Sequence, residues 1–237
     1  MDISGKVVLI TGASAGIGLA TARRFAQEGA RLALVARTEH LLARLADELR
    51  AQGAEVLVVP ADLRDPAQVA HAVTETVRQY GRLDILINNA GQAAVGTVAD
   101  LNLEDFRQIV DLNVYAPVLA MQAAIPVMRE HGGGLIINVS SMVSKMRIPS
   151  LGAYAATKAA LNMLSATARG ELAADNIRVI TVYPRMTTTE FSKHSLGDRA
   201  HHQRQHANPN VPTDTAEHVA DRILAAAINE PEEQYME

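Results

Sequence analysis

The 237-residue sequence contains no cysteine and no tryptophan, and aromatic side chains make up only 3% of it. Without cysteine the chain forms no disulfide, offers no thiol nucleophile and builds no thiolate metal site. Its formal net charge of −4 argues against a protein that wraps a nucleic-acid backbone. No continuous apolar run approaches the roughly 20 residues of a membrane-spanning helix, and residues 1–6 do not resemble a signal peptide. We therefore expect a cytoplasmic protein without a metal site.

The sequence does have the composition of a globular chain, with 48% hydrophobic and 20% charged residues. Short apolar runs alternate with stretches of helical periodicity, and no linker divides the chain. The predicted strands are Lys6–Thr11, Arg31–Ala36, Glu55–Pro60, Leu83–Asn88, Leu135–Val139 and Ile177–Val182. The predicted helices are Ile17–Gly29, Glu39–Gln52, Pro66–Gly81, Leu103–Glu130, Leu151–Ala174 and Asp214–Asn229. We expect kinks near Pro117 and Pro126, and Tyr235-Met236 as the candidate start of a seventh strand.

Strands that are apolar along their whole length and alternate with helices predict a parallel sheet covered on both faces. The fold class expected is therefore a single, doubly wound α/β domain over residues 1–237, with six or seven strands. The 187–212 stretch is polar and rich in histidine. Because it follows the sixth strand, it is positioned to cover the carboxyl ends of the strands, and we interpret it as a substrate lid.

A glycine-rich loop joins the first strand to the first helix. Gly12, Gly16 and Gly18 have the spacing G-x-x-x-G-x-G. Missing side chains let the backbone approach a pyrophosphate, and the helix N-terminus offers free N–H groups to that anion. The loop predicts dinucleotide binding, with a plain glycine-rich turn as the alternative.

The end of the second strand bears on the choice of nucleotide. An NAD site places a carboxylate there for the ribose hydroxyl, but this sequence reads Ala36-Arg37-Thr38. Arg37 is suited to pair with the additional 2′-phosphate of NADP, although a solvated arginine is the alternative. We therefore expect NADP(H) in preference to NAD(H). Asp62 and Leu63, after the third strand, are candidates to flank the adenine.

Tyr154 and Lys158 are four residues apart in a predicted helix and so share one face. A neighbouring ammonium favours the phenolate and is expected to lower the pKa of Tyr154 towards a range useful for acid–base catalysis. Ser140 and Ser141 end the preceding strand. The combination predicts proton transfer at a substrate oxygen.

These residues together resemble the short-chain dehydrogenase/reductase family, in its short single-domain branch with TGxxxGxG and YxxxK motifs. The resemblance covers about the first 190 residues and includes Asn88-Asn89-Ala90-Gly91 after the fourth strand. It implies a Rossmann-type fold and the catalytic set Asn113, Ser141, Tyr154 and Lys158. The residues that the loop, the strand ends and the resemblance assign to the cofactor are Gly12, Ser14, Ala15, Gly16, Ile17, Gly18, Arg37, Thr38, Asp62, Leu63, Asn89, Ala90, Gly91, Tyr154, Lys158, Pro184, Thr187 and Thr189.

The resemblance also implies a mechanism. Ser141 would hold the substrate oxygen, and Tyr154 would give that oxygen a proton in reduction or remove it in oxidation. Lys158 would stabilise the phenolate and hold the nicotinamide ribose, and Asn113 would anchor a relay water. The function expected is an NADP(H)-dependent oxidoreductase of carbonyls and secondary alcohols. The alternatives are a 3-oxoacyl thioester reductase and a non-enzymatic nucleotide-sensing protein.

Two features depart from the family pattern or invite another interpretation. Arg185 follows Pro184 where the family has glycine, and either contacts a cofactor phosphate or anionic substrate or points to solvent. The histidines of the polar stretch favour a solvated loop over a metal site. The resemblance further implies a homo-oligomer, a tetramer or a dimer, built on the two long helices, with a small molecule as the other partner.

Overall fold

The computed structural model describes residues 1–197 and 213–236. Seven strands form a parallel sheet in the order β11-β7-β6-β4-β1-β2-β3. These strands are β1 (Val7–Thr11), β2 (Arg31–Ala36), β3 (Val56–Pro60), β4 (Ile85–Asn88), β6 (Gly134–Val139), β7 (Ile177–Tyr183) and β11 (Glu233–Tyr235). The predicted doubly wound α/β class is confirmed, and the sheet has seven strands because β11 pairs with β7.

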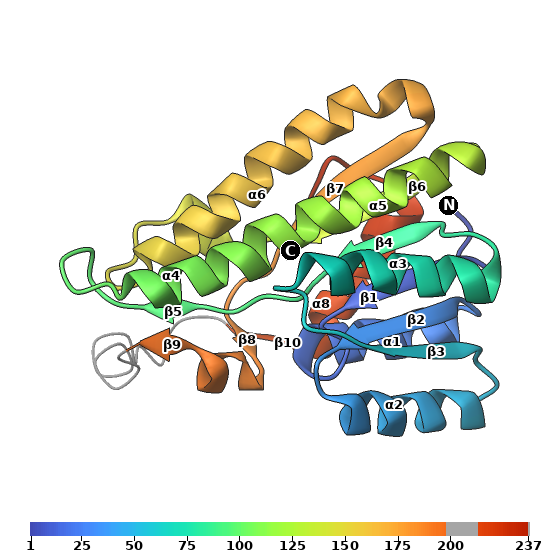
Figure 1. The fold of residues 1–237 in the computed structure, drawn as a ribbon, viewed down its shortest axis with the longest axis horizontal. Coiled ribbons are helices and arrows are strands. Elements are labelled where there is room, and N and C mark those ends of the chain that lie inside the picture. The colour runs from blue at the N-terminus through green and yellow to red at the C-terminus, as the bar shows by residue number, and fades with distance from the viewer. Residues whose placement is uncertain (198–212, 237) are drawn as a thin grey trace.

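Helices cover both faces of the sheet (Figure 1). They are α1 (Gly16–Gln27), α2 (Glu39–Ala51), α3 (Pro66–Tyr80), α4 (Leu103–Val110), α5 (Ala116–Glu130), α6 (Gly152–Glu171) and α8 (Ala216–Asn229). One core cluster joins the sheet to apolar residues of α1, α2 and α8, with Phe25 among them. A second cluster joins the other face to α3 and α5, with Met121 among them. The fully apolar strands are therefore buried between two helical layers.

The longest helical region, Leu103–Glu130, is interrupted by a π-helical segment, η1 (Asp111–Tyr115). The amide of Ala116 donates to the carbonyl of Asp111, five residues back. The irregularity precedes Pro117, which has no amide proton to offer to the carbonyl of residue 113. Pro126 lies inside α5. The sequence pattern anticipates a kink at the prolines but not a widened turn before the first of them.

This region has the length and the mean hydropathy, 1.3, of a helix that crosses a membrane. It contains charged residues such as Arg107 and Asp111, so it is apolar on average and is not a continuous apolar run. However, 44% of its most apolar window is buried inside the protein. Ala120 and Ala124 pack into the core between α5 and the sheet. The apolar content of this helix therefore serves packing in the fold.

Small paired strands lie beyond the carboxyl ends of the sheet (Figure 1). β5 (Ala94–Val95) pairs with β9 (Leu196–Gly197), and β8 (Thr187–Thr188) pairs with β10 (Asp214–Thr215). Two-residue strands give no periodicity in the sequence, so pattern reasoning did not predict them. They position the segment after β7 above the ends of β1, β4 and β6.

Candidate active site

The glycine loop lies where the strand order reverses, between β1 and β4, which is the usual ligand crevice of such sheets. Gly12 has φ +68°, and a Cβ there would meet Ala90 Cα at 2.9 Å. A Cβ on Gly18 would stand 2.3 Å from the carbonyl oxygen of Gly12. The loop is thus folded tightly enough that only glycine fits at both positions.

The first turn of α1 begins directly after this loop. Within the described part of the chain, no side chain caps its N-terminal amides. Gly16 has φ +54°, and a Cβ added at this position would lie only 3.2 Å from Cγ2 of Thr189. Free amides, positive dipole and a cradle without side chains fit a dinucleotide pyrophosphate. Ser14, Ala15 and Ile17 belong to the same turn.

The Asn-Asn-Ala-Gly segment is hydrogen-bonded to the loop. The Asn89 side-chain amide donates to the carbonyls of Thr11 and Gly12, at 2.8 and 3.3 Å. The hydroxyl of Thr11 accepts from the amides of Asn89 and Ala90. These bonds tie the end of β4 to the loop after β1. Asn89 and Ala90 therefore support the loop after β1, which agrees with the role in stabilising the central sheet that the family resemblance implies.

The residues predicted to contact the adenosine follow the ends of β2 and β3. Arg37 is exposed and Thr38 is the N-cap position of α2. The Asp62 carboxylate pairs with Arg64 at 2.6 Å, and its pKa is lowered, first by this hydrogen bond and also by the nearby charge of Arg37. Leu63 is buried. The charge of Arg37 therefore acts on the Asp62 carboxylate. The Arg37 side chain is exposed at the surface, where it can contact an anion.

The π-helical segment presents Asn113 to the interior, where it is fully buried. Its side-chain oxygen accepts from the amide of Gln92 at 2.9 Å. Its side-chain nitrogen donates to the Gln92 carbonyl at 2.8 Å and to the Thr157 hydroxyl at 3.0 Å. Asn113 thus connects the segment after β4 to α6. π-Helical turns often occur at functional sites, which agrees with this placement.

Tyr154 and Lys158 lie one turn apart on α6, as their spacing predicts, and both are buried. Lys158 Nζ donates to the Val139 carbonyl at 2.8 Å and lies 6.0 Å from the centre of the Tyr154 ring. Burial lowers the pKa of Lys158 to about 8. A Cβ on Gly91 would approach both Asn113 Oδ1 (3.3 Å) and Lys158 Nζ (3.4 Å). Glycine at 91 therefore keeps a space open between Asn113 and Lys158.

Burial raises the pKa of Tyr154 to about 12, and a hydrogen bond with Ser141 opposes the shift. The direction is opposite to the one expected from the nearby ammonium. Loss of water around a ring that is 8% exposed is the largest cause of the shift, and Lys158 is not among its causes, since its Nζ is bonded to a backbone carbonyl. The structure thus favours the neutral phenol.

The two serines at the end of β6 differ in their partners. The Ser140 hydroxyl is bonded to Asn162 on α6. Ser141 caps the short helix η2 (Met142–Lys145), and its oxygen accepts from the Val143 amide at 3.2 Å. Of these two serines, only Ser141 affects the pKa of Tyr154, which it lowers against the effect of burial.

The segment after β7 supplies the remaining predicted residues. Pro184 is buried, and its carbonyl accepts from the Met142 amide at 2.9 Å. Thr189 approaches Gly16 and caps η4 (Glu190–His194). Thr187 donates from its hydroxyl to the carbonyl of Arg185 at 3.0 Å.

Two contacts here could not be predicted from the sequence, although the residues that make them belong to segments expected near the substrate. The ring of Phe191 lies 5.7 Å from that of Tyr154, in a tilted contact. The Gln92 side chain donates to the His194 carbonyl at 2.6 Å and so holds η4 over the site. Neither belongs to a motif, and a separation of 102 residues between Gln92 and His194 leaves no local signal.

Arg185 forms a two-point ion pair with Asp214, at 2.8 and 3.1 Å. The sequence left open a contact with a cofactor phosphate or an anionic substrate, or a side chain that points to solvent; the structure adds this ion pair, with the Arg185 side chain 44% exposed. Asp214 is 8% exposed and belongs to β10, so the pair joins both sides of the β8–β10 contact. A partner 29 residues away could not be read from the sequence.

Part of the stretch interpreted as a lid, residues 198–212, lies outside the described residues, as do His201, His202 and His206. Within the described ranges, no group of three histidine or acidic side chains is placed to hold a metal ion.

Comparison with known proteins adds the family. A sequence profile described as short chain dehydrogenase matches residues 6–200. The chain belongs to the short-chain dehydrogenase family. As a member, it is an oxidoreductase of alcohol or carbonyl groups that uses a nicotinamide cofactor.

Individual family members resemble the chain over most of its length. A 3alpha-hydroxysteroid dehydrogenase of Mediterraneibacter gnavus is 37% identical over 193 residues, or 81% of this chain and 77% of that protein. The crystal structure of L-sorbose reductase from Gluconobacter frateurii, complexed with NADPH and L-sorbose, has a TM-score of 0.84 at 35% identity, covering 95% and 91% of the two chains. A short-chain dehydrogenase/reductase from Burkholderia phymatum in complex with NAD has a TM-score of 0.91 at 26% identity, covering 100% and 90%.

Proposed function

We propose that this short-chain dehydrogenase interconverts a small or medium-sized carbonyl compound and its secondary alcohol with NADP(H). The observation that carries the proposal is the arrangement around Tyr154. Its phenol is buried, Ser141 is near enough to lower its pKa against the effect of burial, and Lys158 lies one helical turn further along α6. A proton donor beside a second hydroxyl group is what protonation of a carbonyl oxygen requires.

In the direction of reduction, Ser141 orients the substrate oxygen and Tyr154 donates its proton to that oxygen. The raised pKa keeps Tyr154 protonated at neutral pH, which is the state needed for donation. Asn113 and Lys158 flank the space beside Gly91. Asn113 anchors a water there, and a proton from solvent passes through this water and Lys158 to restore the phenol. In the direction of oxidation, Tyr154 accepts the alcohol proton, and an ammonium at Lys158 favours the resulting phenolate.

The cofactor is assigned to the crevice between the ends of β1 and β4. Its pyrophosphate is assigned to the turn formed by Gly12, Gly16 and Gly18, which leaves the amides of α1 free. Bound there, the nicotinamide supplies or accepts the hydride. Exposed Arg37 and apolar Ala36 support NADP(H) over NAD(H), because the site offers a cation to a 2′-phosphate and no carboxylate to a ribose.

The rim of the proposed substrate site is largely apolar. Met146 follows the Ser141 turn, Met186 follows β7, and Phe191 touches Tyr154; these side chains are 51%, 54% and 39% exposed. The segment carrying Phe191 continues into the 187–212 stretch, to which we assign the role of a lid. Flexible methionines suit substrates of varied shape with apolar substituents next to the carbonyl.

The proposal is tested with a panel of carbonyls and alcohols, assayed with NADPH and with NADH for the parent protein and for Tyr154→Phe. We expect turnover with NADPH in the parent, and Tyr154→Phe to bind NADPH unchanged while losing ~10²–10⁴-fold in kcat. Near-parent activity in the variant would contradict the role of Tyr154. A clear preference for NADH would contradict the interpretation of Arg37.

The same panel separates the other functions. Faster turnover of 3-oxoacyl thioesters than of simple ketones would assign the chain to thioester reduction. Binding of NADPH without turnover of any compound would favour a nucleotide-sensing protein. The presence of Ser141, Tyr154 and Lys158 together argues for catalysis, since a sensor has no need of an acid–base pair.

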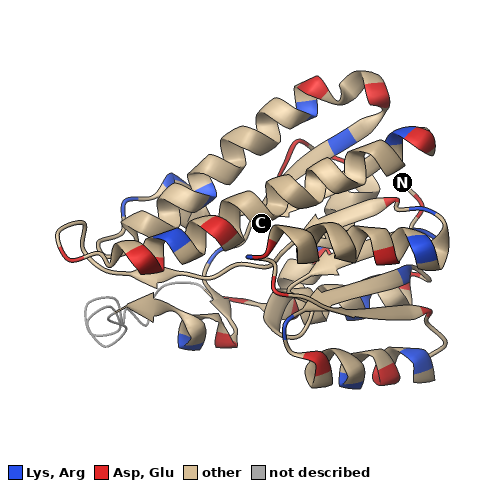
Figure 2. Cartoon of the chain, in the orientation of Figure 1, with Lys and Arg blue, Asp and Glu red and all other residues tan. Residues whose placement is uncertain are grey.

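We also propose a homo-oligomer, a tetramer or a dimer, in the cytoplasm. α5 and α6 lie near one another and carry few charges along their length (Figure 2). The side chains of Leu103, Tyr115 and Met163 on this side are 62%, 57% and 70% exposed. Light scattering during gel filtration measures the assembly, and a monomeric mass would contradict the proposal.

A further inference from the structure

Four side chains form a compact cluster where β7 and β11 end, next to the turn that carries Ser141. Lys145 Nζ lies 3.1 and 3.4 Å from the two carboxylate oxygens of Glu233 and donates to the Tyr235 hydroxyl at 2.5 Å. The hydroxyls of Tyr183 and Tyr235 each donate to Glu233, both at 2.6 Å. The carboxylate is therefore bonded by a cation and two phenols at once.

The two aromatic rings complete the cluster. They are stacked with centres 4.9 Å apart and planes 10° apart, and Tyr183 is 2% exposed. Lys145 Nζ lies 4.2 Å from the centre of the Tyr183 ring and 5.0 Å from that of Tyr235. Cations are attracted to aromatic faces at such distances. Hydrogen bonding, first to Tyr235 and then to Glu233, raises the pKa of Lys145, so the cation persists across the physiological range.

Lys145 is also the last residue of η2, the short helix that Ser141 caps. Ser144 donates its hydroxyl proton to the Ser141 carbonyl at 2.6 Å, and the Val143 amide donates to the Ser141 hydroxyl at 3.2 Å. Only a few bonds within one tight turn therefore separate Lys145 from the serine oxygen. A displacement of the Lys145 end of η2 is transmitted to Ser141.

We infer that Lys145 is a positioning residue, through which the C-terminal strand β11 holds the Ser141 turn in its working geometry. Glu233 and Tyr235 lie in β11, in parallel register with Thr181 and Tyr183 of β7. Glu233 and Tyr235 bind the Lys145 ammonium from the edge of the sheet. The backbone of Lys145 belongs to η2, in the loop after β6. The inference rests on the proposed function only for the step in which Ser141 orients the substrate oxygen.

The test compares the parent with Lys145→Met, which keeps a long side chain beside the stacked rings but removes the charge. Lys145→Arg is the conservative variant, since a guanidinium also pairs with a carboxylate and stacks on aromatic rings. Arg23→Met is the matched control. It breaks the ion pair with Glu48, whose side chains are 44% and 37% exposed, close to the 38% and 40% of Lys145 and Glu233.

Two readouts are measured: kcat with the KM for NADPH, and hydrogen–deuterium exchange at the amides of residues 142–146 in the protein without substrate. We expect Lys145→Met to lower kcat about ten- to a hundredfold with an unchanged KM for NADPH, and to accelerate exchange within this turn. Lys145→Arg should restore both properties, and Arg23→Met should behave as the parent.

Parent-like exchange in Lys145→Met would overturn the inference, as would a kcat within twofold of the parent. An equal loss of kcat and cofactor affinity, without rescue by arginine, would also overturn it, because it would indicate general disruption. If the parent turns over no carbonyl or alcohol, the proposed function fails. The exchange measurement then decides alone whether Lys145 holds the turn.

Discussion

Burial sets the protonation states of the two residues at the centre of the candidate site. Tyr154 and Lys158 are 8% and 3% exposed, and loss of water favours the neutral form of each. The pKa of the tyrosine is raised to about 12, and that of the lysine is lowered to about 8. The ammonium of Lys158 is therefore retained at neutral pH at a cost in folding free energy.

This cost predicts the behaviour of Lys158→Met in the cofactor-free protein. Below about pH 8, the parent carries a buried charge that the variant lacks. The variant should therefore be more stable at pH 7, by up to about 3 kcal/mol, while losing its activity. Urea unfolding at a series of pH values measures the free energy of unfolding of both proteins.

The pH dependence provides the sharper part of that prediction. Between pH 8 and 10.5, the unfolded lysine binds a proton that the folded one does not, so the parent gains stability as the pH rises. The variant has no such group, and the two free energies should converge towards pH 10.5. A difference that stays constant from pH 7 to 10 would contradict a buried, destabilised ammonium.

The sequence allowed part of this residue-level description. A spacing of four residues placed Tyr154 and Lys158 on one face of α6, and the structure shows them there. The shift in the tyrosine pKa was predicted in the wrong direction, because sequence spacing carries no information on depth of burial. The Lys145–Glu233 ion pair could not be predicted from the sequence either, because 88 residues separate its members.

At the level of elements, the glycine loop is held by contacts that leave no free volume. Gly18 packs against the Gly12 carbonyl, and the Asn89 side chain closes the same space. The motif spacing was therefore enough to predict the tight turn. It could not show that the neighbouring surface comes from β4 as well as from the loop itself.

Gly18→Ala tests this packing. The new Cβ would stand 2.3 Å from the Gly12 carbonyl oxygen and 2.5 Å from Asn89 Nδ2, so the loop must shift. We expect a loss of stability of about 1–3 kcal/mol and NADPH binding weakened by at least about 1.4 kcal/mol, which is tenfold. Thermal unfolding and a fluorescence titration with NADPH measure the two effects.

Gly170→Ala is the control within α6. Within the described part of the chain, nothing lies within 4 Å of a Cβ added at Gly170. Alanine should stabilise this exposed helical position by about 0.5–1 kcal/mol, with unchanged NADPH affinity. If Gly18→Ala binds NADPH as tightly as Gly170→Ala, the cradle does not depend on the close approach at Gly18.

The long elements were predictable and the short ones were not. Each of the six predicted strands forms within two residues of its expected bounds, because strong apolar runs specify buried strands. The pairs β5–β9 and β8–β10 depend on contacts between distant segments, such as the Arg185–Asp214 ion pair beside β8. The π-helical turn likewise lacks a local pattern, apart from the proline that follows it.

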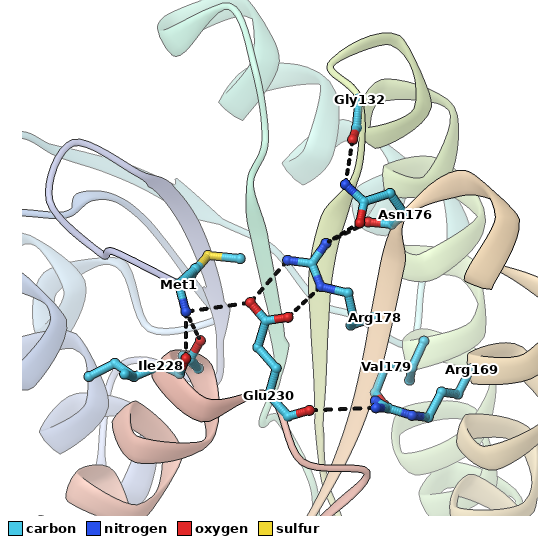
Figure 3. Close-up of polar contacts among 9 residues, drawn as sticks. Met1, Gly132, Arg169, Asn176, Arg178, Val179, Ile228 and Glu230 are labelled. Carbon is cyan, nitrogen blue, oxygen red and sulfur yellow. Dashed lines mark hydrogen bonds and ion pairs between the residues drawn. The ribbon is translucent and has the colours of Figure 1, made fainter.

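At the scale of the whole molecule, a polar network joins the ends of the chain to the middle of the fold (Figure 3). The Glu230 carboxylate pairs with Arg178 of β7 at 2.6 Å and with the N-terminal ammonium of Met1 at 3.4 Å. Arg178 also donates to the carbonyl of Asn176, whose side chain donates to Gly132. Elements far apart in sequence therefore meet on one partly buried carboxylate, away from the catalytic edge.

Glu230→Gln tests whether this network contributes to stability. The side chains of Glu230 and Arg178 are 24% and 25% exposed, so solvent screens their two hydrogen bonds only in part. Losing the charge should lower the free energy of unfolding by about 1–3 kcal/mol at pH 7. The matched control is Glu104→Gln, whose partner Arg107 and own side chain are 71% and 65% exposed; that change should stay within about 0.5 kcal/mol.

The free energy of unfolding at acidic pH shows whether charge causes the effect of Glu230→Gln. Hydrogen bonding to Arg178, the largest contribution, holds the pKa of Glu230 below its ordinary value of 4.5. A lowered pKa in the folded state gives stability that is present above pH 4.5 and lost as the pH falls through the folded value. The parent and Glu230→Gln should therefore differ at pH 7 and converge in acid, when the parent carboxylate is protonated. A gap that persists at the lowest pH where the protein is folded would attribute the effect to altered packing and not to charge.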